Sequence, residues 1–134
     1  MFLDRNLLFS DEQDIGAGSG TQVSDYSVSL GTAKNLARGR QLYLIIIIDE
    51  TFATSTSINF QFVTDTLATL ASPTVQMETG AIAIASLTAG RAPIVIPIGS
   101  AIGTEEQYCG VQYTEAGSNS TAGKVTAFLG VDSP

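Results

Sequence analysis

QYCGVQYT, residues 107–114, and TAGKVTAFL, residues 121–129, flank a turn rich in Gly, Ser and Asn near the end of the chain. Both runs are strand-like, because they are short, mostly apolar and contain few charged residues. A short Gly-containing connection between two such runs is typical of a hairpin. The end of the chain therefore predicts two strands, paired as a closing β-hairpin.

Alternation of apolar and polar residues with a period of two recurs along the chain, and no segment of about ten residues keeps a helical period. About eight or nine short strands with Gly-, Ser- and Asn-rich connections are typical of a sandwich or jelly roll. We therefore predict one all-β domain over residues 1–134, an antiparallel β-sandwich of jelly-roll type with about eight strands and little or no helix. The expected strands are Leu3–Phe9, Val23–Leu30, Gln41–Asp49, Ser57–Thr64, Pro93–Ile98, Glu106–Thr114 and Lys124–Val131, with two short runs around Thr79-Gly80 that form a hairpin or two edge strands.

Two of these strands carry more specific expectations. The run LYLIIII, residues 42–48, does not alternate, so both of its faces should be covered, either by an overlying part of the chain or by another subunit. In the segment Val23–Leu30, the side chains of Tyr26, Val28 and Leu30 should share one face.

Three other segments are expected to be irregular or to lie at the edge of a sheet. The prolines of Pro93–Ile98 cannot donate to a ladder, so this segment should be either an edge strand or a strand that begins and ends abruptly. Thr32–Arg40 reads as a single helical turn or an irregular crossing. Asp65–Ser72 permits one short helical turn, although its β-branched threonines disfavour it.

The net charge is −7, and only 14% of the residues are charged. Nucleic-acid binding requires clustered Lys and Arg, so we expect no nucleic-acid partner. A weakly charged surface suits a protein that packs against its own copies or a large partner. The longest aliphatic run is too short for a membrane helix, and the first residues do not resemble a signal peptide, so we expect neither a membrane partner nor secretion.

Residues able to support catalysis are scarce. The chain has no His and one Cys, Cys109, whose place in an apolar strand pattern predicts a small buried hydrophobe. Its acidic pairs, Asp11-Glu12, Asp49-Glu50 and Glu105-Glu106, should point to opposite faces or solvate turns at strand ends. We therefore predict a protein that is not an enzyme and that uses no cofactor or metal.

Short segments in a fixed order cover nearly the whole chain: Leu3–Leu8 with Ser10-Asp11; Val28–Gly31 with Gln41–Leu44 and Asp49–Phe52; Leu87–Gly90 with Val95–Ile98; and Tyr113 with Thr121–Ala127. In this order they resemble the jelly-roll capsid cement, or decoration, proteins of tailed phages, of the Bordetella-phage type. The resemblance implies a structural virion protein that self-associates, as a dimer rather than a trimer. It also implies synthesis in the host cytoplasm and binding to the outer surface of the capsid, where the protein bridges major capsid proteins.

Two groups of residues are our predicted partner contacts. The first is an extended arm within residues 1–10. The second is a short basic segment that would dock against an acidic partner, and the alternative for this segment is a solvated loop. The alternative for the first group is that it forms the first strand of the sandwich. The residues are Phe2, Leu3, Leu7, Leu8 and Phe9 in the arm, and Lys34, Arg38 and Arg40 in the basic segment.

The main rival function is carbohydrate binding by a receptor-binding or lectin-like jelly roll. Sugar sites favour exposed aromatic rings beside polar side chains. This chain has no Trp, and its tyrosines, Tyr26, Tyr43, Tyr108 and Tyr113, mostly lie inside strand patterns. A third reading is an Asp/Glu pair that acts on sugars, which requires two carboxyl groups facing each other across a cleft.

Overall fold

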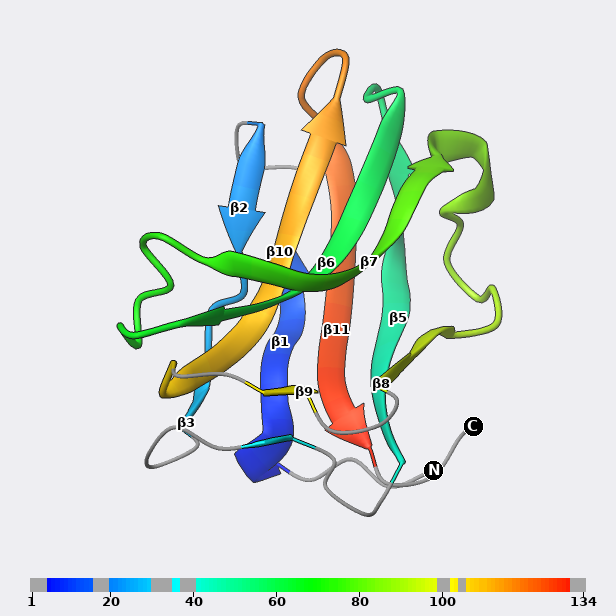
Figure 1. Ribbon diagram of the computed structural model, residues 1–134. Coiled ribbons are helices and arrows are strands. Elements are labelled where there is room, and N and C mark those ends of the chain that lie inside the picture. Colours follow the sequence, from blue (N-terminus) through cyan, green and yellow to red (C-terminus); the bar gives the residue numbers. More distant parts are fainter. Residues whose placement is uncertain are drawn as a thin grey trace.

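The computed structural model describes residues 5–15, 20–29, 35–36, 41–98, 102–103 and 106–130, which form two antiparallel sheets packed face to face (Figure 1). In spatial order, the first sheet contains β1 (Leu8–Asp14), β11 (Ala122–Gly130), β5 (Leu42–Ala53) and β8 (Ile94–Ile98). The second contains β2 (Thr21–Val23), β10 (Tyr108–Ala116), β6 (Ser57–Asp65) and β7 (Thr74–Ala83), with β3 (Val28–Ser29) also paired to β10. The remaining elements are the paired β4 (Asn35–Leu36) and β9 (Ile102–Gly103) and two 3-10 turns, η1 (Arg5–Leu7) and η2 (Ile84–Ser86).

The strand order confirms the predicted fold class. When the four main strands of each sheet are numbered one to eight along the chain, the sheets read 1-8-3-6 and 2-7-4-5. This is the order of a jelly roll, in which the chain repeatedly crosses between two sheets. The prediction of an edge position for β8 is also confirmed, although Pro97 lies inside the strand, opposite Tyr43.

The predicted closing hairpin is wrong. β10 pairs with β6, β2 and β3, whereas β11 pairs with β1 and β5 in the other sheet. The connection after β10 turns at Gly117, where φ is 78°, and the Glu115 carboxylate accepts a hydrogen bond from the Ser120 N–H at 2.8 Å. Alternation specifies the buried face of each strand, but it does not specify the partner strand.

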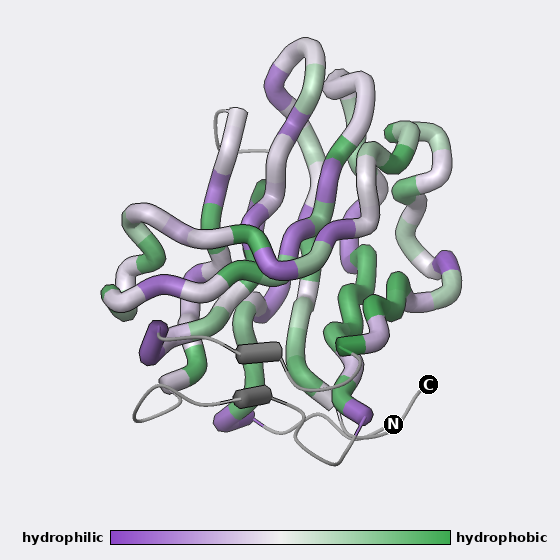
Figure 2. Tube along the Cα trace, viewed as in Figure 1, coloured by the Kyte–Doolittle hydropathy of each residue, from purple (hydrophilic) through white to green (hydrophobic). Residues whose placement is uncertain are grey.

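The core lies between the two sheets, where the inward residues of each strand form one apolar cluster. Figure 2 shows the apolar and polar residues interspersed along the strands. β6 contributes Ile58, Phe60 and Phe62, all fully buried, as the alternation of Ser57–Thr64 predicts. The ring of Phe60 meets that of Tyr113 edge-on, with centroids 5.8 Å apart. Burial of each such side chain contributes about 1.5–3 kcal/mol.

β5 is covered on both faces where its sequence does not alternate. Leu44 and Ile46 belong to the core cluster, while Ile45 on the opposite face is also fully buried, beside the fully buried Phe128 of β11. The prediction that both faces of this strand are covered is therefore confirmed at Ile45, and there the same chain provides the cover. Among the described residues the structure has no helix with the length and apolar character that a membrane crossing requires.

β7 is one continuous strand at a sheet edge, so the predicted edge position is confirmed, whereas the predicted division into two strands around Thr79-Gly80 is wrong. The two residues lie opposite Phe60 alone, between the pairs Asn59↔Ala81 and Gln61↔Glu78. This is a β-bulge, which Gly80 accommodates because its φ is 76° and other residues resist that conformation. Bulges protect an exposed edge because they interrupt the regular row of donors and acceptors.

The β6–β7 connection contains turns instead of the helical turn that Asp65–Ser72 permits. The buried Asp65 organises it, because its carboxylate accepts hydrogen bonds from the N–H groups of Ser72 at 2.9 Å and Thr66 at 2.6 Å. These bonds, chiefly the one from Ser72, hold the pKa of Asp65 below its ordinary value.

Acid should weaken the fold through Asp65. A carboxylate with a lowered folded pKa stabilises the protein above its unfolded pKa of about 4, and this stability is lost as the pH falls through the folded value. We expect urea midpoints between pH 7 and pH 2 to fall less steeply for Asp65→Asn than for the parent. Parallel curves for the two proteins would contradict this role of Asp65.

Candidate partner surfaces and a ligand pocket

The predicted arm residues separate in the structure. Phe2, Leu3, Lys34, Arg38 and Arg40 lie outside the described residues. Leu7 ends η1 and packs against the core cluster, and Leu8 begins β1 half-buried. Phe9 is fully buried, with its ring 6.3 Å from that of Phe62, so a surface contact for Phe9 is wrong. The alternative reading as the first strand of the sandwich holds for Leu8 and Phe9, although β1 runs on to Asp14.

Bulges gather carboxylates on the outer face of the first sheet. Asp11 and Glu12 together oppose the single residue Thr126, and Glu12 adopts a left-handed φ of 47°. Both side chains are exposed, which a regular strand would not allow. Because β1 continues to Asp14, the prediction that this pair lies at a strand end is wrong.

The second acidic pair also lies inside a strand, because β5 extends to Ala53. Asp49 is the extra residue of a bulge between the pairs Lys124↔Glu50 and Val125↔Ile48. Its carboxylate accepts a hydrogen bond from the Thr126 hydroxyl at 2.6 Å, and Glu50 accepts one from the Gly123 N–H at 2.9 Å. These two carboxylates thus stabilise the bulged contact of β5 with β11.

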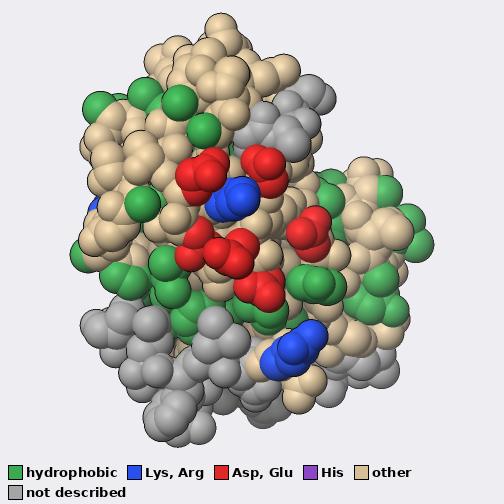
Figure 3. Space-filling model, turned by 180° about the vertical axis from the view of Figure 1, so that it is seen from behind, with side chains coloured by type: hydrophobic (Ala, Val, Ile, Leu, Met, Phe, Trp, Pro, Cys, Tyr) green, Lys and Arg blue, Asp and Glu red, His purple; other side chains and the backbone are tan. Residues whose placement is uncertain are grey.

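The outer face of the first sheet is therefore acidic around one cation. Figure 3 shows acidic side chains surrounding a basic one on this side of the molecule. The pairing register sets Lys124 opposite both Asp14 and Glu50. No group of His, Cys, Asp or Glu in the part of the chain that the structure describes is arranged to hold a metal ion.

The outer face of the second sheet is polar and largely uncharged. Glu78 accepts hydrogen bonds from the side-chain amides of Asn59 at 3.0 Å and Gln61 at 2.9 Å. Gln61 in turn accepts a hydrogen bond from the Thr114 hydroxyl at 3.0 Å. These bonds hold the pKa of Glu78 below its ordinary value, with Gln61 the larger cause. This face is a hydrogen-bonded ladder across β7, β6 and β10.

A buried polar network joins the edges of the two sheets. The Ser10 hydroxyl donates to Gln13 Oε1 and lies 2.7 Å from the Tyr113 hydroxyl. Gln13 Oε1 also accepts from the Asp25 N–H, and its Nε2 donates to the Val23 carbonyl, both at 2.9 Å. The network therefore fixes the bulge of β1 relative to the segment between β2 and β3.

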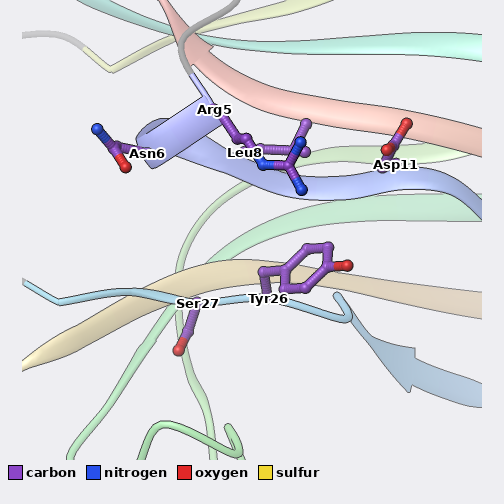
Figure 4. Close-up of a pocket in the computed structure, with 6 residues that line it drawn as sticks. All are labelled: Arg5, Asn6, Leu8, Asp11, Tyr26 and Ser27. Carbon is purple, nitrogen blue, oxygen red and sulfur yellow. The ribbon is translucent and has the colours of Figure 1, made fainter.

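A pocket of about 230 Å³ opens beside this network, between the start of β1 and the segment between β2 and β3 (Figure 4). Tyr26 forms one wall and is 55% exposed. Arg5, Leu8 and Asp11 lie across from it. Asn6 and Ser27 complete the lining.

The sequence did not indicate this pocket, because its pattern places Tyr26 on the face of a strand. The predicted strand Val23–Leu30 is interrupted after Val23, where Ser24 donates a hydrogen bond from its hydroxyl to the Tyr26 carbonyl at 2.8 Å. Ser and Asp often form such local bonds in place of a ladder. The dipeptide Ser24-Asp25 was therefore the available signal, and Leu30 lies outside the described residues.

Cys109 faces the core, as predicted, and burial raises the pKa of its thiol to about 12. The thiolate is the reactive form, so the folded protein should react with a thiol reagent at pH 8 on the order of a thousandfold more slowly than the unfolded chain. The measurement is the rate of colour release from an aromatic disulfide with and without denaturant. Equal rates would show that the thiol is not protected.

Comparison with known proteins places this jelly roll in a family. No curated protein matches the sequence. The family model described as Bbp16 matches residues 9–129, which include β2 to β10 and nearly all of β1 and β11. The chain therefore belongs to the Bbp16 family, which carries the name of a Bordetella phage protein.

Proposed function

We propose that this protein is a capsid cement, or decoration, protein that binds the outer surface of an assembled phage head and bridges neighbouring major capsid proteins. The observation that carries the proposal is the Bbp16 family match over residues 9–129, together with a jelly roll whose chemistry lies on its surfaces. The proposed role is structural and requires no catalysis. The protein would be made in the host cytoplasm and would reside on the outside of the virion.

Binding to the assembled lattice is sufficient for this role. A protein that binds the assembled shell and not its separated subunits stabilises the shell by mass action. The gain is about 2.7 kcal/mol per site when its free concentration is roughly 100 times the Kd. Many modest contacts repeated by symmetry therefore strengthen a shell against the outward pressure of packaged DNA.

The described surfaces are compatible with that position. The acidic face around Asp11, Glu12 and Asp49 would repel nucleic-acid phosphates, which suits the outside of a DNA-filled shell. The ladder of Asn59, Gln61 and Thr114 offers polar groups at low net charge. Charged residues are depleted in the centres of protein interfaces, so this second face is the better candidate for direct contact.

The proposed partners are the major capsid protein and a second copy of this chain, in a dimer. Phe2 and Leu3 remain predicted contacts of the arm. Leu7 in η1 and Leu8 in β1, both half-buried, remain predicted partner contacts outside an arm. Lys34, Arg38 and Arg40 remain the predicted charged dock. A deletion that tests the arm must end before Phe9, because Phe9 is a core residue and its removal would also destabilise the fold.

Co-sedimentation with expanded empty capsids tests the proposal. The parent protein should pellet with the capsids, and a variant lacking residues 1–4 or carrying K34A, R38A and R40A should pellet less. The control variant, R91A with K124A, also removes basic side chains and should pellet like the parent. Parent protein that stays in the supernatant at low salt would overturn the proposed function.

A further inference from the structure

One wall of the pocket beside Tyr26, the segment between β2 and β3, is held to β1 by hydrogen bonds. The Tyr26 N–H donates to the Phe9 carbonyl at 2.9 Å, so the segment between β2 and β3 is tied directly to β1. The Asp25 N–H donates to Gln13, whose side chain belongs to the buried Ser10–Tyr113 network. A preformed site loses little conformational freedom on binding, which favours affinity.

The same local structure leaves two of the lining side chains exposed. The bulge at Asp11 and Glu12 leaves both of these neighbouring side chains exposed. In a regular strand, one of two neighbours would face the core instead. The break after β2 leaves the ring of Tyr26 more than half exposed. Figure 4 shows Arg5 and Leu8 facing this ring from the opposite wall, with Asp11 farther along β1.

The chemistry of the lining selects a neutral ligand with several hydroxyl groups. Arg5 supplies donors only and Asp11 supplies acceptors only, and their charges cancel within the pocket. A phosphate or carboxylate would meet Asp11 and a chain of net charge −7, so an anion is disfavoured. Hydroxyl groups both donate and accept, and they can satisfy the guanidinium and the carboxylate together.

The exposed ring and the size of the pocket narrow the ligand further. An aromatic face packs against the apolar face of a ring whose edge is polar. The volume of about 230 Å³ lies below the range of about 300–1,000 Å³ typical of drug-sized ligands, so it suits one small ring. We propose that this pocket binds a single neutral pyranose unit, stacked on Tyr26 and hydrogen-bonded by Arg5 and Asp11.

Saturation-transfer NMR on the full chain tests this assignment. The probes are the methyl glycosides of D-glucose, D-galactose and D-mannose at millimolar concentration. We expect transfer to the ring protons of at least one glycoside. Affinity should fall about tenfold or more in Tyr26→Ala and about tenfold in Asp11→Asn, and less than about twofold in Tyr26→Phe, which keeps the stacking face.

A matched control variant distinguishes binding in the pocket from nonspecific binding to exposed apolar side chains. Leu67 is 54% exposed, close to the exposure of Tyr26, and does not line the pocket. Leu67→Ala should bind the glycosides as the parent does. Absence of transfer from all three glycosides, or equal loss in Tyr26→Ala and Leu67→Ala, would overturn the sugar site. Thermal unfolding of Tyr26→Ala shows whether the variant is folded, because the N–H bond to Phe9 does not require the ring.

The proposed sugar site and the proposed capsid role can be tested independently of each other. Tyr26→Ala should co-sediment with expanded capsids as well as the parent does. A Tyr26→Ala protein that loses capsid binding would show that the pocket holds a segment of a capsid protein, which would overturn the sugar assignment. Sugar binding by a protein that never binds capsids would leave the pocket assignment standing and remove the cement proposal.

Discussion

Replacement of Phe9 with alanine is expected to lower the free energy of unfolding by about 3–5 kcal/mol. The ring is fully buried, contacts that of Phe62 and belongs to the central apolar cluster, so its removal leaves a cavity between the sheets. A loss of this size is a large part of the stability of about 5–15 kcal/mol typical of a domain. Urea-induced unfolding of the purified variant, followed by circular dichroism, measures it.

Leu8 provides the control in the same strand. Its side chain is half-buried and pairs across the sheet with Phe128, so Leu8→Ala should cost clearly less than Phe9→Ala. The comparison separates a strand from an arm, because an arm residue that contacts only a neighbour would leave the stability of the isolated chain unchanged. Equal and negligible effects at both positions would contradict the structure of β1.

Gly123→Ala is expected to lower the free energy of unfolding by about 2–5 kcal/mol. Gly123 has a φ of 142°, which L side chains rarely adopt. An added Cβ would lie 2.5 Å from Cδ1 and 2.7 Å from Cε1 of the Phe52 ring, which is buried and cannot move freely. The site also includes the hydrogen bond from the Gly123 N–H to Glu50, so strain there would disturb the bulge that joins β5 to β11.

Gly90 separates the two causes of this loss. Its φ is 84°, but no atom lies within 4 Å of an added Cβ. Gly90→Ala should therefore show the cost of backbone conformation alone, about 1–2 kcal/mol. Thermal unfolding of both variants measures the difference, and a Gly123→Ala protein as stable as Gly90→Ala would show that Phe52 moves aside.

Local alternation predicts the core faces of the strands well. Ile58, Phe60 and Phe62 lie in the core because a half-buried strand requires apolar residues at every second position. The non-alternating run in β5 indicates two covered faces for the same reason, and Ile45 is indeed buried. These features depend on one strand at a time, and the sequence of that strand contains the information.

Features that depend on two strands could not be predicted in this way. The crossing of β10 and β11 into different sheets depends on partners distant in sequence, so the Gly-rich turn between them looks like a hairpin turn. The bulge at Thr79-Gly80 depends on a register with β6, and the chain alone suggests two strands there. Bulges also explain why both Asp11 and Glu12 are exposed.

The candidate pocket is a further case of the same limit. It requires Arg5 from η1 and Asp11 from β1 on one side, and Tyr26 from the segment between β2 and β3 on the other. A buried network that contains Tyr113 joins β1 to that segment. The sequence offered the turn-forming Ser24-Asp25, but not the neighbours that this turn would bring together. The predicted basic dock at Lys34, Arg38 and Arg40 lies outside the described residues and remains a prediction.

We propose that the protein acts through its surfaces as a component on the outside of a phage head. Electron cryomicroscopy of the whole particle, at a resolution that shows side chains, tests it most directly. We expect density for a jelly roll with the 1-8-3-6 and 2-7-4-5 sheets on the outer face of the shell, repeated by symmetry and touching at least two major capsid proteins. A particle whose outer shell lacks this density would contradict the account.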